Sequence, residues 1–478
     1  MLKKTKIVAT ISDRNCDVEL IKTLQKAGMD VVRLNTAHQT HSDTLKVINN
    51  VRKVSDKIAL LLDTKGPEIR TTMAVESIPV VHGDRITLKG DPEGITSRDC
   101  VYVNYKGFVK DVPVGSRILI DDGDIELIVA EKSKSGLTCE VANNGEISGK
   151  KSVNIPSVHV KLPTLSQKDI EYIHFAVDNN LDFIAHSFVR NRQDVIAVQK
   201  ILNERGSDIK IIAKIENQDG VDNIDEILDH VYGIMIARGD LAVEIPQERI
   251  PIIQKMIIEK CISNRKPVIT ATQMLHSMIQ NPRPTRAEIS DVANAVYDGT
   301  DAIMLSGETA YGKYPEESVK TMAKIAMEIE SSKRQISETP LLIINNEISA
   351  FLARSAVKAS LELNAKAIIA DTNKGRTIRA LAAYRGNKII FAQCYHKSVM
   401  RELALSYGVY ANYSEVHSTT EAFLCDALND LKKNYQVNKK DRIVLLAGNF
   451  GVSHGPSFIE ISTAHNLMQQ CQKTSINP

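Results

Sequence analysis

The sequence predicts an α/β protein: a TIM (β/α)8 barrel with an inserted all-β lid domain and a C-terminal open-sheet α/β domain. Three observations support this fold class. Eight short apolar runs alternate with helical patterns, a turn-rich stretch interrupts them, and a further strand–helix alternation follows. The length of 478 residues agrees with several domains, because a domain typically holds roughly 100–200 residues.

The eight apolar runs are the predicted barrel strands. They are short, β-rich and continuously apolar, as is typical of parallel strands that are buried on both faces. Amphipathic helical patterns separate most of them, and eight such units over about 250 residues are the pattern of a TIM barrel. We therefore expect the barrel domain at residues 1–70 and 156–335, with strands at 6–11, 31–34, 58–62, 183–185, 211–215, 234–237, 268–271 and 303–305.

A different composition marks the insertion at residues 71–155. Val, Ile, Gly and Asp dominate it, and turn signals recur at His82-Gly83-Asp84, Asp122-Gly123-Asp124 and Asn144-Gly145. This spacing predicts a small β-barrel domain. Because the insertion follows the third strand, on the face where active-site loops lie, we expect it to act as a lid.

A third domain is predicted at residues 341–478. Ser337-Glu338-Thr339-Pro340 has the composition of a linker, and helices and strands alternate again after it. The clearest strands are at 368–370, 389–391 and 443–446. This pattern indicates an open α/β sheet.

Composition and charge exclude several classes of protein. Sixty Lys+Arg against fifty-eight Asp+Glu give a net charge of +2, which provides no general attraction to nucleic acid or membrane. No segment approaches the ~20 apolar residues of a membrane span, and the N-terminus lacks the pattern of a signal peptide. Seven scattered cysteines without a Cys-x-x-Cys pair favour reduced thiols. We expect a cytoplasmic location.

Polar residues gather at the carboxyl ends of the predicted strands, where TIM-barrel active sites lie. Lys214 and Glu216 point to one side of the fifth strand, and Asp240 follows the sixth. Two carboxylates are what Mg²⁺ commonly takes from a protein. Gly239 lets the backbone approach an anion. A structural ion pair at Lys214 and a surface turn at Asp240 are the alternative interpretations.

The second, third and seventh strands end on further candidates. Arg33 can hold a phosphate bidentately, and Thr272 offers a hydroxyl. A hydroxyl bonded to the backbone is the alternative for Thr272, and a satisfied loop histidine for the nearby His38. Oxygen ligands for a second cation are available from Asn35, Asp63 and the carbonyl of Thr64.

Together, these side chains describe phosphoryl transfer, in which positioning and charge neutralisation carry most of the catalysis. The sequence contains neither a Walker A motif nor the Gly-rich motif of protein kinases, which excludes those nucleotide folds. The blocks at the strand ends resemble those of the pyruvate kinase family, in order through both barrel segments. They include Arg33-Leu34-Asn35, Asp63-Thr64-Lys65-Gly66-Pro67-Glu68-Ile69-Arg70, Lys214-Ile215-Glu216-Asn217, Ala237-Arg238-Gly239-Asp240-Leu241, Ala271-Thr272-Gln273-Met274-Leu275 and Met304-Leu305-Ser306-Gly307-Glu308-Thr309-Ala310.

The resemblance implies a glycolytic enzyme that transfers phosphoryl from phosphoenolpyruvate to ADP, giving pyruvate and ATP. Glu216 and Asp240 would bind Mg²⁺ (or Mn²⁺), and Lys214, expected to be protonated, would stabilise the phosphoryl group in flight. Arg33 would hold the phosphate of phosphoenolpyruvate. The backbone at Gly239 and Asp240, with the Thr272 hydroxyl, would hold its carboxylate, and Thr272 would lie near the proton relay to the enolate carbon.

The resemblance also implies a nucleotide site and a potassium site. Arg70 and Lys151 would reach the nucleotide phosphates, with Asn35 and His38 nearby. K⁺ would bind Asn35, Asp63 and Thr64. Family members commonly have serine where this chain has Ala37, so we expect activation by K⁺ with weakened affinity. A glutamate at the position of Glu68 accompanies potassium dependence in the family. The hydroxyl of Thr36, which is adjacent to Ala37, is expected to point elsewhere and so not to replace the serine hydroxyl.

In the C-terminal domain the family often binds an allosteric sugar phosphate. The loop of Thr372, Asn373, Lys374, Gly375, Arg376 and Thr377 follows a strand and opens a helix, where a phosphate can be cradled. A capped loop without a ligand is the alternative. The resemblance further implies a homotetramer, with the 285–288 segment near a subunit interface.

Two alternatives to the kinase are considered. A Mg²⁺-dependent lyase or aldolase of the related phosphoenolpyruvate/pyruvate barrels would use the same Glu and Asp, but it needs neither the lid with Lys151 nor the 63–70 segment. A non-enzymatic metabolite-binding protein predicts losses at Lys214, Glu216, Asp240 or Arg33, and all four residues are present.

Overall fold

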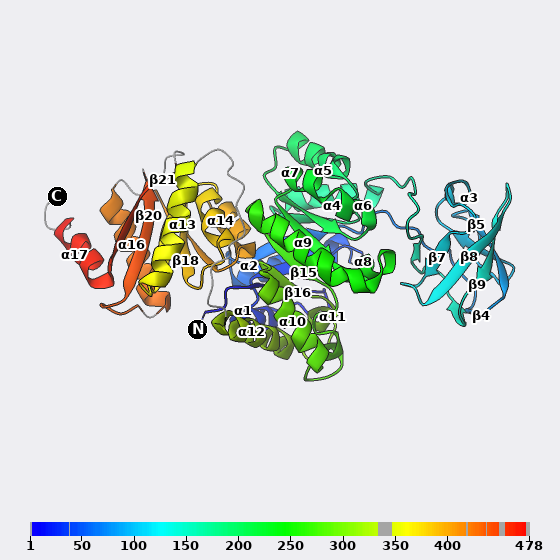
Figure 1. The fold of residues 1–478 in the computed structure, drawn as a ribbon, viewed down its shortest axis with the longest axis horizontal. Helices are drawn as coiled ribbons and strands as arrows, with labels where there is room; N and C mark the ends of the chain where they lie inside the picture. The colour runs from blue at the N-terminus through cyan, green and yellow to red at the C-terminus, as the bar shows by residue number, and fades with distance from the viewer. Residues whose placement is uncertain are drawn as a thin grey trace.

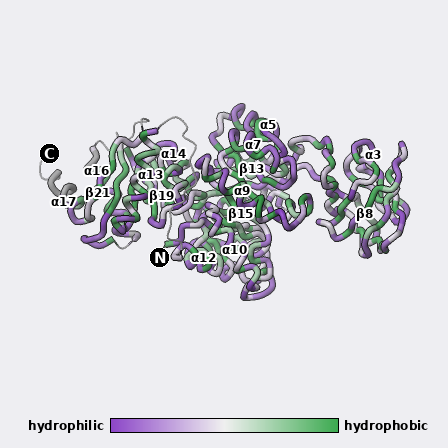
Figure 2. The backbone as a smooth tube through the Cα atoms, in the orientation of Figure 1, coloured by the Kyte–Doolittle hydropathy of each residue, from purple (hydrophilic) through white to green (hydrophobic). Residues whose placement is uncertain are grey.

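The computed structural model describes residues 2–37, 39–332, 347–416, 419–435, 437–448 and 455–474. Three bodies lie in a row: the inserted β domain at one end, the barrel in the middle and the C-terminal domain at the other end (Figure 1). Hydrophobic stretches follow the strands inside each body, and hydrophilic stretches are prominent in the outer loops (Figure 2). Among the helices of the described residues, none combines the length and hydropathy needed to cross a membrane.

A closed barrel of parallel strands forms the central body, as predicted. The strands pair in the order β1-β16-β15-β14-β13-β12-β3-β2. Successive residues face opposite sides: Val8 packs inside the barrel, whereas Ile7 packs outward against the helices. The strands are β1 (Lys6–Thr10), β2 (Val31–Asn35), β3 (Ala59–Asp63), β12 (Phe183–His186), β13 (Lys210–Ile215), β14 (Gly233–Ala237), β15 (Val268–Ala271) and β16 (Ala302–Leu305).

Helices surround this barrel, and local capping explains where several of them begin. Thr40, Ser166 and Thr285 each accept a hydrogen bond from the backbone three residues on and form a capping box. The helices are α1 (Val18–Ala27), α2 (His41–Val54), α4 (Gln167–Asp178), α5 (Arg192–Glu204), α6 (Gln218–Asp222), α7 (Ile224–His230), α8 (Arg238–Glu244), α9 (Ile250–Ser263), α10 (Arg286–Asp298), α11 (Gly307–Ala310) and α12 (Pro315–Ser332), with short 3₁₀ turns η1 (Gln247–Arg249) and η2 (His276–Ile279).

The inserted domain is all-β apart from one short helix, and it has its own core. Six strands pair in the order β11-β7-β8-β9-β5-β6, and β10 pairs with β4. Isolated bridges from Arg70 to Ser152 and from Thr71 to Val103 link the two ends of the six-stranded sheet. The elements are β4 (Ile78–Val80), β5 (Arg85–Gly90), β6 (Cys100–Val103), α3 (Phe108–Asp111), β7 (Arg117–Ile120), β8 (Ile125–Lys132), β9 (Leu137–Val141), β10 (Gly145–Ile147) and β11 (Val153–Asn154).

The C-terminal domain is an open α/β sheet, as predicted. Its strand order is β19-β18-β17-β20-β21, with β21 antiparallel to β20 and the other pairs parallel. The elements are α13 (Glu347–Glu362), β17 (Ala367–Thr372), α14 (Arg376–Ala383), β18 (Ile389–Cys394), α15 (Lys397–Glu402), η3 (Leu403–Leu405), β19 (Val409–Tyr413), α16 (Thr420–Tyr435), β20 (Arg442–Gly448), β21 (Pro456–Thr463) and α17 (Ala464–Thr474). The predicted linker at 337–340 lies outside the described residues, and the domain boundaries stay predictions.

Ion pairs attach the C-terminal domain to the amino-terminal end of the barrel. Asp301 directly precedes β16, and its Oδ2 lies 2.6 Å from Nη2 of the buried Arg385. Asp182 directly precedes β12, and its Oδ1 lies 2.6 Å from Nε of Arg401. The carboxyl ends of the strands are therefore left to face the inserted domain.

The cysteines only partly follow the expectation of reduced thiols. Five are free and buried, namely Cys16, Cys100, Cys139, Cys261 and Cys394. The expectation is wrong for Cys425 of α16, which is disulfide-bonded. Sequence spacing could not reveal this bond, because it depends on which parts of the chain meet after folding.

Candidate active site

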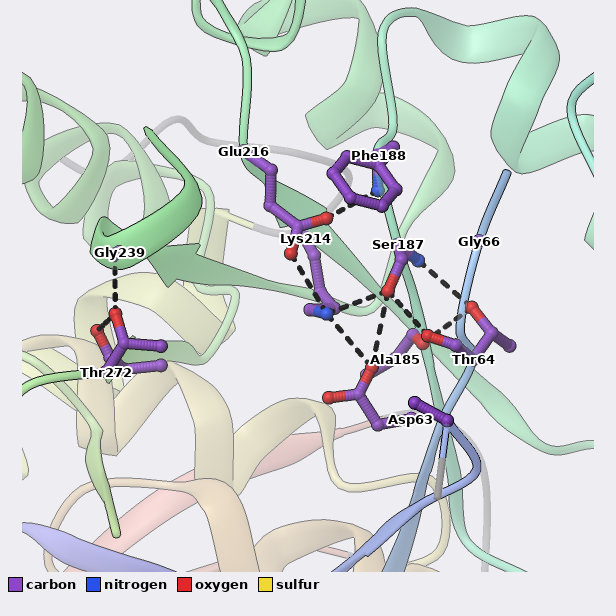
Figure 3. Close-up of polar contacts among 12 residues, drawn as sticks. Asp63, Thr64, Gly66, Ala185, Ser187, Phe188, Lys214, Glu216, Gly239 and Thr272 are labelled. Carbon is purple, nitrogen blue, oxygen red and sulfur yellow. Dashed lines mark hydrogen bonds and ion pairs between the residues drawn. The ribbon is translucent and has the colours of Figure 1, made fainter. Parts of the chain in front are cut away.

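Lys214 is the centre of a buried polar cluster at the carboxyl end of the barrel (Figure 3). Its Nζ lies 3.0 Å from Asp63 Oδ1, at the end of β3, and 3.0 Å from Glu216 Oε1, which directly follows β13. It also donates a hydrogen bond of 2.7 Å to the hydroxyl of Ser187. The barrel thus brings together residues that the sequence analysis placed on separate strand ends.

The charges in this cluster depend on one another. Burial by itself lowers the pKa of Lys214, but the charges of Asp63 and Glu216 outweigh it and hold that pKa well above its ordinary value. The lysine is therefore an ammonium, as expected. Burial and the nearby charge of Asp240 raise the pKa of Glu216 to about 7, against the opposing charge of Lys214. Burial also raises the pKa of Asp240.

These two carboxylates fit a hard cation. Glu216 is buried and the nearby Asp240 is half-buried. Both side chains offer carboxylate oxygens, and each would keep its charge more easily beside a divalent ion. Within the described residues, no three side chains of His, Cys, Asp or Glu form a complete metal cage. One or two carboxylates are the usual protein contribution for Mg²⁺, whose remaining ligands are water and substrate oxygens.

Arg33 and the predicted potassium ligands lie beside the cluster. The Arg33 side chain donates from Nε to Asp63 Oδ2 at 2.6 Å and from Nη1 to Thr10 Oγ1 at 3.0 Å. Burial alone would raise the pKa of Asp63, but the charges of Lys214 and Arg33 hold it below its ordinary value. The Thr64 carbonyl accepts a hydrogen bond of 2.6 Å from Ser187.

Side chains at the end of β2 and in the loop after it are bonded to backbone groups. The Thr36 hydroxyl donates to the Asp63 carbonyl at 2.8 Å, so it is engaged with the backbone. Asn35 Oδ1 accepts the N–H of Ala37 at 3.1 Å. His38 lies outside the described residues, so its predicted place near the nucleotide stays a prediction.

Thr272 meets Gly239 at the ends of β15 and β14. The Gly239 N–H donates to Thr272 Oγ1 at 2.7 Å, and that hydroxyl donates to the Ala271 carbonyl at 2.7 Å (Figure 3). The Thr272 hydroxyl is therefore bonded to the backbone, as in the alternative interpretation, but it also lies beside Gly239 in the predicted substrate site. Thr272 and Gln273 have positive φ angles of 67° and 53°, which non-glycine residues rarely adopt.

A cavity of about 530 Å³ lies between the barrel and the inserted domain. Its lining includes Glu216 and Asp240 from the barrel, and Arg70 and Asp122 from the other side. The Arg70 side chain contacts the Glu68 carboxylate and donates to the Lys150 carbonyl. Lys151 Nζ lies 2.6 Å from Asp121 Oδ2, so in this conformation the lysine pairs within the inserted domain.

Two residues of the cluster were missed by the sequence analysis. Ser187 accepts from Lys214, and the Phe188 N–H donates to Glu216 Oε2 at 2.6 Å. Phe188 has a φ of 55°. Both follow β12, so the rule that found the other candidates, polar residues at strand carboxyl ends, also points to Ser187.

The predicted effector loop connects β17 to α14. The Thr372 hydroxyl accepts the N–H of Gly375 at 2.8 Å, and Gly375 has a φ of 74°. This contact is that of a capped loop, which was the alternative interpretation.

The barrel and its site define a class of protein. A protonated lysine between two carboxylates, with an arginine alongside and an inserted domain across the cavity, is typical of phosphoryl-transfer enzymes. Residues 2–319 match the model of the pyruvate kinase barrel domain, and residues 351–462 match that of the pyruvate kinase alpha/beta domain.

Individual relatives agree with these two matches. A pyruvate kinase of Borreliella burgdorferi is 50% identical over 98% of each chain. One of Staphylococcus epidermidis is 44% identical over 94% of this chain and 78% of its own length. The crystal structure of a pyruvate kinase from Cryptosporidium parvum superposes with a TM-score of 0.90 at 36% identity, covering 97% of this chain and 96% of that one. This chain belongs to the pyruvate kinase family, and it is a phosphotransferase.

Proposed function

We propose that this chain transfers the phosphoryl group of phosphoenolpyruvate to ADP, giving pyruvate and ATP in glycolysis. The observation that carries the proposal is the protonated Lys214 held between Asp63 and Glu216 beside the cavity. A buried ammonium offers a fixed positive charge where negative charge develops on the transferring group, and it needs no reorganisation during the reaction. Its hydrogen bond to Ser187 holds the ammonium in place.

Glu216 and Asp240 would hold Mg²⁺ (or Mn²⁺), which when bound supplies charge neutralisation and orients the phosphate oxygens. Arg33 would bind the substrate phosphate with N–H groups that now contact Asp63 and Thr10. The backbone of Gly239 and Asp240, together with the Thr272 hydroxyl, would hold the substrate carboxylate. Thr272 would also lie near the path by which a proton reaches the enolate carbon.

The inserted domain would close over the nucleotide and exclude water. Arg70 and Lys151 would contact the nucleotide phosphates, with Asn35 and His38 nearby. We further propose a cytoplasmic location, a homotetramer and a sugar-phosphate effector at residues 372–377. Each of these finer points rests on the family resemblance.

The lid makes a specific prediction, because Lys151 is paired with Asp121. We expect Asp121→Asn to lower the KM for ADP by up to about fivefold, since a partly exposed ion pair contributes at most about 1 kcal/mol and its loss frees the ammonium for phosphate. Initial rates at varied ADP measure it. Asp124→Asn in the same turn is the control and should change nothing. A KM for ADP that rises in Asp121→Asn would contradict the predicted role of Lys151.

Potassium dependence gives a second prediction at Ala37. K⁺ would bind Asn35, Asp63 and the Thr64 carbonyl, and a hydroxyl at position 37 would add a ligand. We expect Ala37→Ser to lower the half-saturating K⁺ concentration about tenfold, if one added oxygen ligand contributes about as much as a hydrogen bond to a charged group. Thr36→Ser is the control, because the Thr36 hydroxyl is used by the Asp63 carbonyl. Equal K⁺ titrations for Ala37→Ser and the parent chain would count against this site.

The activity itself is tested by measuring pyruvate formation from phosphoenolpyruvate with Mg²⁺, with and without ADP, in K⁺ and in Na⁺. ADP-dependent pyruvate with stoichiometric ATP is the expected result. Consumption of phosphoenolpyruvate without ADP would favour the lyase. A folded, Mg²⁺-binding protein without turnover would favour the non-enzymatic metabolite-binding protein. K⁺-independent turnover would keep the kinase and remove the proposed potassium site.

A further inference from the structure

Arg238 makes an unusually complete set of contacts for a residue outside the proposed catalytic set. Its Nε donates to the Ala271 carbonyl at 3.3 Å, its Nη2 to the Thr272 carbonyl at 2.8 Å, and its Nη1 to Gln254 Oε1 at 3.3 Å. Asp291 takes the two remaining donors, with Oδ1 and Oδ2 each at 2.6 Å. All five N–H groups of the guanidinium thus have an acceptor.

We propose that Arg238, held by Asp291, is a positioning residue for Thr272. The inference deepens the proposed function, on which it rests, because Thr272 is the residue proposed to hold the substrate carboxylate and to lie near the proton path. Among the described residues, no hydrogen bond of Arg238 reaches Lys214, Glu216 or Asp240, so its effect passes through Thr272.

The contacts fix the backbone of Thr272 on both sides. The Ala271 carbonyl belongs to the peptide plane before Thr272, and the Thr272 carbonyl belongs to the plane after it. The φ and ψ of a residue are the rotations between these two planes. One rigid, planar guanidinium that bonds to both carbonyls therefore sets both angles together.

Such a restraint is needed because the conformation is strained. Thr272 has a φ of 67° and the next residue, Gln273, a φ of 53°. Threonine is β-branched, and the left-handed region is especially unfavourable for such side chains. Strained backbone of this kind persists where the surrounding contacts over-determine it.

The same segment also places the Thr272 side chain. Gly239 follows Arg238 directly, and its N–H donates to Thr272 Oγ1 at 2.7 Å. Arg238 therefore holds the Thr272 backbone while its neighbour holds the hydroxyl. The hydroxyl and the Gly239 N–H, which are both proposed to bind the substrate carboxylate, are kept together by one turn of chain.

Arg238 is in turn held by two barrel helices. Its side chain is 10% exposed, and its carboxylate partner Asp291 lies on α10. Gln254 lies on α9 and donates to Asp298 Oδ2 at 2.9 Å, which ties that amide to α10 as well. The restraint on Thr272 is thus anchored in the helical layer of the barrel.

The experiment is a double-mutant cycle with Arg238→Lys and Thr272→Ala, after circular dichroism shows that each variant is folded. The rate measured is the exchange of the C3 hydrogens of pyruvate with D₂O, by NMR, with Mg²⁺, K⁺ and ATP present. Arg238→Lys keeps the positive charge but loses the planar guanidinium, whose N–H groups bond to both carbonyls at once. It should slow the exchange about 10²-fold, the size of effect that misplacing a reacting group produces.

If Arg238 acts through Thr272, Arg238→Lys should slow the exchange by less than about twofold once Thr272 is alanine. An equal loss in both backgrounds would overturn the proposal. Arg385→Lys is the matched control, since Arg385 also forks a carboxylate and bonds two backbone carbonyls, but at the opposite end of the barrel. It should leave the exchange unchanged.

A crystal structure of Arg238→Lys decides the geometry without any activity. We expect φ of Thr272 to leave the positive region or its hydroxyl to separate from the Gly239 N–H. An unchanged Thr272 would overturn the proposal. If the parent chain neither forms pyruvate nor exchanges its C3 hydrogens, the proposed function fails, and the crystal structure still decides whether Arg238 positions Thr272.

Discussion

Replacing Lys214 with methionine should lower the rate of pyruvate formation by roughly 10³–10⁵-fold, the range in which cations at transferring phosphoryl groups contribute. The side chain lies 3.0 Å from both Asp63 and Glu216 and is almost fully buried, so water cannot supply an equivalent positive charge. Its removal also leaves two carboxylates facing each other. The measurement is kcat at saturating phosphoenolpyruvate, ADP and Mg²⁺.

The same strand provides the control. Lys210 begins β13, at the other end of the barrel, where its Nζ lies 3.5 Å from Glu402. Lys210→Met removes the same charge from the same strand and should leave kcat within about twofold, because it affects only a partly exposed ion pair. A Lys214→Met variant that keeps a tenth or more of the parent kcat would contradict the role proposed for Lys214 in phosphoryl transfer.

Glu216→Gln has the second largest expected effect. It removes one of the two charges that would hold the divalent cation, while its amide oxygen can still accept the Phe188 N–H. We expect the half-saturating Mg²⁺ concentration to rise about 10²-fold or more, since even outer-sphere partners contribute 10–100-fold to metal affinity. Direct binding of Mn²⁺, followed by electron paramagnetic resonance, measures this without requiring turnover.

Glu244→Gln is the matched control for this experiment. Glu244 lies on α8, lines the same cavity and accepts a hydrogen bond from Asn154 at 3.1 Å. Burial raises the pKa of Glu244, as it does for Glu216. Unchanged Mn²⁺ binding is expected for Glu244→Gln. Mn²⁺ binding that is lost equally in both variants would indicate that the cation binds elsewhere in the cavity.

The barrel could be predicted closely, and the reason lies in its strands. The run predicted at 31–34 is β2 (Val31–Asn35), and that at 303–305 is β16 (Ala302–Leu305). A strand buried on both faces must be apolar at nearly every position, which leaves a local signal in the sequence. The carboxyl ends of parallel strands also meet at one end of a barrel, so Lys214, Glu216 and Asp63 could be expected to lie close together.

Other parts of the site could not be predicted from pattern. Arg33 was expected to be ready for phosphate, but its Nε donates to Asp63. Lys151 was expected near the nucleotide, but it pairs with Asp121 in this conformation. Both contacts join residues about thirty positions apart, and no local periodicity encodes which of several nearby acceptors a long side chain selects.

The sequence by itself determined the class of fold and the positions of the residues at the strand ends, because burial on both faces and turn chemistry act over a few neighbouring residues. Only the tertiary structure decided that Asp63 and Glu216 hold the pKa of Lys214 above its ordinary value and that Arg238 fixes a strained Thr272. Those features depend on distances, burial and side-chain directions among residues from different strands and helices. They arise only when the barrel closes.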